Sequence, residues 1–241
     1  MQILSKKVCE LVDENFIYGR ALHYLGISFF DCENKTLREI CEEKQIDHKR
    51  LLRSFYRFDS NARISLSEIK SFPIQLVVSY LRFSHQTYIK DSLPYIAELI
   101  QRLEPKQEAV SDLIAVFPDF VEDFIKHIYE EEDQLFGHID RMVRSKHSHH
   151  SLTSIAMRSF HINLSDQQAL HEEEDEMEAL RSLLMEIKVD SLHLEVIKKE
   201  IQAFDRELLY HATIENEILF PKAIELESSV KNRIADLSRL N

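Results

Sequence analysis

The chain contains few of the residues that build tight turns. Among its 241 residues there are only three glycines and five prolines. A sandwich or barrel of many short strands is therefore disfavoured, because each tight hairpin needs Gly, Asn or Asp at its turn. Leu, Ile, Glu, Lys, Arg and Gln dominate instead, and these residues lose little side-chain freedom in a helix. Since a hydrophobic content of 44% is enough for a core, the composition predicts an all-α protein.

Long apolar runs and an even set of cysteines are also missing. No apolar run reaches the length of about 18 residues that a membrane span needs, so we expect no membrane partner. The start of the chain, MQILSKKVCELVDENF, is typical of an amphipathic helix with acidic residues inside it and is unlike a signal peptide. The three cysteines are Cys9, Cys32 and Cys41. This usage favours a reduced, cytoplasmic location.

The charge of the chain is strongly acidic. Asp and Glu number 42 against 30 Lys and Arg, which gives a formal net charge of −12 before its twelve histidines are counted. An acidic body repels phosphate backbones, so nucleic acid is not an expected partner unless a local basic patch binds it.

Two regions are expected from the pattern of apolar and polar residues. A small helical domain should occupy residues 1–60, and within it Thr36 and Glu39 have the spacing of a capping box that starts a helix. The segment FDSNARISLS (58–67) is polar and rich in turn residues, which indicates a boundary. Residues 61–241 should then form the second domain.

The second domain is predicted to be an up-down-up-down four-helix bundle. Apolar periodicity predicts long helices over 73–103, 107–144, 155–187 and 192–222, followed by a short amphipathic tail. Pro94 lies inside the first of these helices and should kink it, because proline removes one backbone donor.

The strongest motif in the sequence occurs twice. The pattern H-x3-E-x3-L-F begins at His127 and again at His211, and it places Glu131 and Glu215 four residues after the two histidines. Residues four apart lie on one face of a helix. We expect the Leu and Phe that close each copy to face the same side, so both His–Glu pairs should point into the core.

Two inward His–Glu pairs predict a metal site. An isolated buried carboxylate is costly, so each Glu needs a partner. Imidazole together with carboxylate suits iron, manganese or zinc. A single copy of this spacing is more commonly a surface ion pair or a core histidine, but two copies in one apolar frame favour metal. The spacing is not the H-E-x-x-H of zinc proteases, so peptide hydrolysis is not indicated.

Further ligands should come from the first and third helices of the bundle. His85 follows Leu81 by four residues and precedes Ile89 by four, so it can point inward. In the acidic run LHEEEDEMEAL (170–180), His171 and Glu174 lie three residues apart, and at least one of them should complete the site. The other acids of this run are expected on a solvated surface.

These stretches resemble the repair-of-iron-centres family (YtfE/ScdA type), in which a short helical domain precedes a hemerythrin-like di-iron bundle. The resemblance covers nearly the whole chain and rests on GISFFDCENKTLREICEEKQIDHKRLL, SHQTYIKDSLPYI, HIYEEEDQLF and HATIENEILFP, of which the last is the most specific. It implies that His85, His127 and His211 are terminal iron ligands. It also implies that Glu131 and Glu215 bridge two irons.

The chain departs from the family pattern at three places. The family has a further His after the first bundle helix, whereas this chain reads EPKQEAV with Gln107. The M-x-x-E-H-D pattern of the family puts Glu174 at a histidine position, where His171, one turn earlier, could substitute. The family's Cys-Cys-Gly-Gly is FDCE (30–33) here, so the thiol pair is missing. We therefore expect an incomplete di-iron site, with zinc or manganese as alternative metals.

The resemblance implies a role in repairing iron–sulfur centres damaged by nitric oxide or oxidative stress. Damaged iron–sulfur proteins would be the partners, and O2 or NO would be a small ligand. A dimer is compatible with the sequence. The sequence leaves open whether the protein is an enzyme. A first alternative is a metal-poor or metal-free bundle that acts as an interaction protein or sensor. A second alternative treats TLREICEEKQIDHKRLLRSF as a helix-turn-helix of a metal- or gas-responsive regulator.

Overall fold

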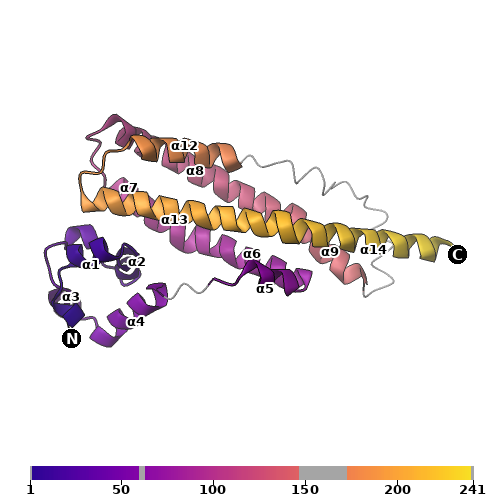
Figure 1. Ribbon diagram of the computed structural model, residues 1–241, viewed down its shortest axis with the longest axis horizontal. Helices are drawn as coiled ribbons and strands as arrows, with labels where there is room; N and C mark the ends of the chain where they lie inside the picture. Colours follow the sequence, from indigo (N-terminus) through magenta and orange to yellow (C-terminus); the bar gives the residue numbers. More distant parts are fainter. Residues whose placement is uncertain (1, 60–62, 147–172, 240–241) are drawn as a thin grey trace. The chain divides into compact units, whose positions relative to one another are not determined.

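The computed structural model describes residues 2–59, 63–146 and 173–239; for a few of these, including 173–176, it describes the backbone alone. The described residues are about 84% helical and contain no strand, only an isolated bridge between Lys7 and Thr36 (Figure 1). The predicted all-α helical bundle fold is therefore confirmed. No helix of the described ranges has both the length and the apolar character that crossing a membrane requires.

Contacts along the chain define two compact units. The first consists of residues 1–63, 93–115 and 181–204, and the second of residues 64–92, 116–180 and 205–241. The first unit therefore includes segments of the predicted bundle as well as residues 1–60. Whether residues 1–60 form a domain of their own stays a prediction.

The N-terminal segment is built from short helices. In order along the chain these are η1 (Gln2–Ser5), α1 (Val8–Glu14), α2 (Ile17–His23), η2 (Phe29–Asp31), α3 (Leu37–Lys44) and α4 (His48–Asp59). The predicted capping box begins α3, since the backbone N–H of Glu39 donates to the Thr36 hydroxyl and the Glu39 carboxylate accepts from the Thr36 N–H at 2.7 Å. Gln45 ends that helix in the left-handed conformation at φ 54°.

The helix α4 has one buried and one basic face. Phe55 stacks on Tyr18 of α2 with ring centroids 4.6 Å apart, and the Ser54 hydroxyl donates to the carbonyl of Ala21. On the opposite side Arg50 and Arg53 are exposed. The helix thus packs against α2, and the alternative interpretation of this region as a helix-turn-helix stays a hypothesis.

The long helices of the chain are composite. One runs through α6 (Ile74–Thr87), the π-helix η3 (Tyr88–Ser92) and α7 (Leu93–Gln101). The next runs through α8 (Glu108–Glu131), the π-helix η4 (Glu132–Phe136) and α9 (Gly137–Lys146). The last runs through α13 (Leu192–Ile214), the π-helix η5 (Glu215–Leu219) and α14 (Phe220–Arg239). The shorter helices α5 (Leu66–Ser71) and α12 (Glu173–Glu186) complete the described set.

One sequence expectation about these helices needs correction. The last helix was expected to end near residue 222 and to be followed by a short tail, but it continues as α14 to Arg239. Pro221 does not end it: the widened turn η5 ends two residues before that proline, and the helix continues through it. At Pro94 the π-helix η3 ends two residues before the proline, and the kink expected there stays a prediction.

The core of the second unit gathers around these composite helices. Its buried apolar residues come from α5, α6, the η4–α9 segment and the α13–η5–α14 segment: Ile69, Val77, Val78, Leu81, Leu135, Phe136, Ile139, Met142, Ile214, Ile218, Leu219, Phe220, Ala223 and Val230. This packing fixes how the three long helices are oriented within the unit, and so it positions the polar residues that they carry inward.

A buried ion pair holds the first unit together. Glu200 on α13 is 1% exposed and pairs with Arg20 of α2. The Arg20 guanidinium also lies over the ring of Tyr95, 5.7 Å from its centroid. The hydroxyl of Tyr95 would come within 2.8 Å of a Cβ at Gly19, so the absence of a side chain there permits this packing.

We predict that Arg20→Ala lowers the free energy of unfolding by about 3 kcal/mol, because it leaves the buried Glu200 carboxylate without its cation. Urea unfolding followed by circular dichroism measures this loss. The double variant R20M/E200L, which removes both charges, should recover most of it. Arg50→Ala is the control at an exposed position and should change stability by no more than about 0.5 kcal/mol. Equal losses in R20A and R50A would contradict the assignment.

Candidate metal centre

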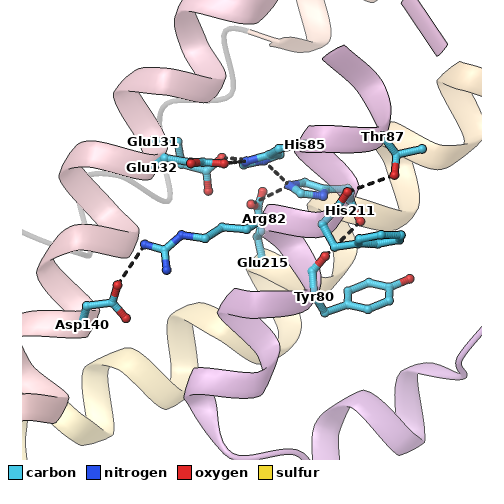
Figure 2. A network of polar contacts seen from close by, with 11 residues as sticks. Tyr80, Arg82, His85, Thr87, Glu131, Glu132, Asp140, His211 and Glu215 are labelled. Carbon is cyan, nitrogen blue, oxygen red and sulfur yellow. Dashed lines mark hydrogen bonds and ion pairs between the residues drawn. The ribbon is translucent and has the colours of Figure 1, made fainter. Parts of the chain in front are cut away.

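Four side chains of the second unit converge on one point. His85 comes from α6, Glu131 is the last residue of α8, His211 lies near the end of α13, and Glu215 begins η5. Each offers one ligand atom, and these four atoms all lie within 4.8 Å of one another. Figure 2 shows the two imidazoles side by side, with Glu131 on one side and Glu215 on the other.

The distances between these atoms fit the donor set of a metal ion. The Nε2 atoms of His85 and His211 lie 3.1 Å apart, and His85 Nε2 lies 3.4 Å from Glu131 Oε2. His211 Nε2 lies 2.9 Å from Glu215 Oε1. Two nitrogens held about 2.1 Å from one ion are separated by about 3.0–3.4 Å, depending on the coordination angle. The imidazoles therefore need little movement to share an ion.

The site is enclosed. His85 is 2% exposed, His211 7% and Glu215 8%. The ring of His85 stacks on Phe136, and the ring of Tyr88 approaches His211 edge-on with centroids 5.8 Å apart. These aromatic contacts fix the ring orientations and keep bulk water away from the donor atoms.

Glu132 is a functional candidate that sequence reasoning missed. Its Oε1 lies 3.0 Å from Nδ1 of His85, on the side of the ring that faces away from the cluster. A neutral His85 that donates its Nδ1–H to Glu132 presents the lone pair of Nε2 to the site. The run Glu130–Asp133 gave only a weak signal, because acidic runs are usually solvated.

Two neighbouring carboxylates contact His85, one at each ring nitrogen. Glu131 is the last residue of α8, and Glu132 is the first residue of the π-helix η4, so the contacts lie where the winding of this helix changes.

Arg82 lies beside the cluster, but its guanidinium forms an ion pair with a residue outside it. Its guanidinium pairs with Asp140 at 2.9 Å and lies over the ring of Phe136, as Figure 2 shows for the ion pair. Tyr88 also has a partner outside the cluster, because its hydroxyl donates to the carbonyl of Glu207. Burial raises the pKa of the Tyr88 phenol, so it stays protonated.

The two carboxylates of the cluster perturb each other. Burial and, next, the negative charge of Glu215 raise the pKa of Glu131 from its ordinary value of 4.5 to about 8, although a hydrogen bond with His85 opposes the rise. In the metal-free protein at pH 7, Glu131 therefore carries a proton. A cation between the carboxylates would displace that proton, because metal ligands must be deprotonated.

The other three residues predicted to be metal ligands are not part of the four-residue cluster. His127 lies on α8 one turn before Glu131, is half-buried, and is not among the four converging residues. His171 lies outside the described residues, as does the side chain of Glu174. A ligand role for these three residues stays a prediction.

Two positions that depart from the family pattern have structural roles within the first unit. The side-chain amide of Gln107 donates to the carbonyl of Lys188 at 2.8 Å and accepts from its N–H at 3.0 Å. It thereby ties the start of α8 to the connection that follows α12. Cys32 is half-buried, its Sγ lies 3.3 Å from the carbonyl of Ser28, and burial raises the pKa of its thiol. It is therefore an ordinary thiol rather than an activated one.

No protein-family model matches the chain, and no curated protein matches it. Its resemblance to the repair-of-iron-centres family therefore rests on the residues and motifs alone.

The raised pKa of Glu131 predicts how the stability of the metal-free protein depends on pH. The folded state binds the proton more tightly than the unfolded state, so this contribution is fully present below about pH 4.5 and is lost as pH rises through about 8. The free energy of unfolding in chelator should therefore fall between pH 5 and 8, by up to about 1.4 kcal/mol per pH unit.

Glu131→Gln, which is neutral at every pH, should flatten this decline. Urea unfolding at a series of pH values compares the two proteins. Parallel curves for the wild type and E131Q would contradict the assignment of the proton to Glu131.

Proposed function

We propose that the chain is a non-haem iron-binding protein of the hemerythrin-like class that acts in the repair of iron–sulfur centres damaged by nitric oxide or oxidative stress. The observation that carries the proposal is the convergence of His85, Glu131, His211 and Glu215 with four ligand atoms within 4.8 Å. The metal-binding part follows from this donor set. The choice of iron and the repair role follow from the family resemblance.

The donor set supports a transition metal over calcium or magnesium. Two imidazoles with two carboxylates suit iron, manganese or zinc, whereas calcium and magnesium prefer oxygen ligands alone. Iron bound there would supply exchangeable positions for a small ligand such as O2 or NO. Glu131 and Glu215 provide the negative charge, and Glu132 holds the ring of His85.

The same features suit reversible binding of iron as cargo. Since Glu131 must give up a proton when a metal binds, we expect binding to weaken as the pH falls. In this proposal the partners that receive the iron are damaged iron–sulfur proteins.

Loading with Fe(II) under anaerobic conditions, followed by desalting and elemental analysis, tests the metal-binding part. The wild type should retain iron, and Glu215→Ala should lose it, because one ligand and the charge of one carboxylate are gone. Glu217→Ala is the matched control, since Glu217 lies on the same π turn but is exposed. Loss of iron in both variants would contradict a specific role for Glu215.

Removing the carboxylate that orients His85 should weaken metal binding without abolishing it. Glu132→Ala is expected to lower the affinity for Zn(II) or Fe(II) about 10–100-fold, since the hydrogen bond to Nδ1 fixes the tautomer and the ring. Competition with a chromophoric chelator measures the affinity. Glu130→Ala, which removes an exposed neighbouring acid, should leave the affinity unchanged. An unchanged affinity in E132A would refute the orienting role.

One observation favours the metal-free alternative. A proton on Glu131 removes the repulsion between the two carboxylates without a cation, so the bundle can fold with an empty site. Under that alternative the chain is an interaction protein or sensor. It would be supported if the wild type retained no iron and if neither Fe(II) nor Zn(II) raised its melting temperature.

A further inference from the structure

The helix that carries His211 and Glu215 changes its winding at the second of these residues. The π-helix η5 begins at Glu215, and the backbone N–H of Phe220 donates to the carbonyl of Glu215, five residues back. In an α-helix it would donate to the carbonyl of Asn216, four residues back. One extra residue is therefore accommodated within this turn.

The extra residue decides which side chains share the face of the site. In an uninterrupted α-helix, Phe220 lies nine residues after His211 and would point about 180° away from it. The π turn sets the following residues back by about 100°, which brings Leu219 and Phe220 onto the side of His211 and Glu215. The burial agrees, because Leu219 is 0% and Phe220 5% exposed.

Pro221 follows this turn at a defined distance. A proline inside a helix cannot donate its backbone nitrogen, and its ring clashes with the carbonyl four residues earlier. For Pro221 that carbonyl belongs to Glu217, which lies within η5. A wider turn relieves the clash, and the helix then continues as α14.

The same arrangement occurs in the helix that carries His85. The π-helix η3 ends at Ser92, two residues before Pro94, just as η5 ends at Leu219, two residues before Pro221. Pro118 is a useful contrast, because it lies inside α8 with ordinary α-helix on both sides. A proline alone therefore does not produce a π turn; at position 221 it coincides with residues that must all face the site.

We propose that Pro221 is a positioning residue of the metal centre. By denying Glu217 its α-helical donor, it maintains the π turn that holds Glu215 against His211 while Phe220 faces the core. This inference rests on the proposed function of the His–Glu cluster as a metal site. It adds the means by which the sequence sets the geometry of that site.

Pro221→Ala tests the proposal. Alanine restores the missing donor and removes the clash, so the turn should relax toward an α-helix. The melting temperature of the metal-free protein should stay the same or rise, while the dissociation constant for Zn(II), measured by chelator competition, should increase at least tenfold. Pro118→Ala is the matched control and should leave the dissociation constant unchanged. A wild-type dissociation constant in P221A, or an equal loss in P118A, would overturn the proposal.

A second measurement is independent of any metal. Couplings across hydrogen bonds in nuclear magnetic resonance identify the carbonyl that accepts from the N–H of Phe220. We expect Glu215 in the wild type and Asn216 in P221A, and a coupling that stays with Glu215 in P221A would overturn the proposal. A wild type that binds no Zn(II) yet shows this change would count against the proposed function and would support the role of Pro221 in the turn.

Discussion

The second unit depends on how it neutralises two buried carboxylates. Glu131 and Glu215 come from different helices and meet beside two imidazoles in an enclosed space. Their mutual repulsion and the loss of hydration make it unfavourable for both to be charged there. A proton on Glu131 relieves the penalty, as would a metal ion between the groups, so metal binding would have to displace that proton.

The need to place these carboxylates next to the imidazoles also affects how the helices are wound. Each of the three helices that supply the cluster contains a π turn that begins no more than three residues after one of its cluster residues. In a regular α-helix each residue is rotated by about 100° from the one before it, so the direction of every side chain is fixed. A polar residue of the cluster and the large apolar residues that follow it would then not all point to the same side. The π turns resolve this conflict locally, and the α-helical packing on either side then provides the stability that keeps them in place.

Much of the cluster could be predicted from the sequence, but not how its members combine. The two H-x3-E pairs indicated the right helices, and His85 was identified from its apolar neighbours. Yet only one of the two pairs contributes both residues: Glu131 meets His85 of another helix, whereas His127 lies a turn away. Glu132 was missed because an acidic run gives no periodic signal. The expected alignment of Phe220 with His211 was correct only because η5 interrupts the α-helical repeat.

The sequence by itself determined that this chain is helical, where three of its long helices begin, and which of these helices carry polar residues on an apolar face. These properties follow from local propensity, capping and periodicity, which act over a few neighbouring residues. Only the tertiary structure decided which His meets which Glu, that Glu132 orients His85, and that Pro221 continues a helix rather than ending it. Such outcomes depend on packing between segments more than 40 residues apart in sequence, where the cost of a buried charge outweighs local preference.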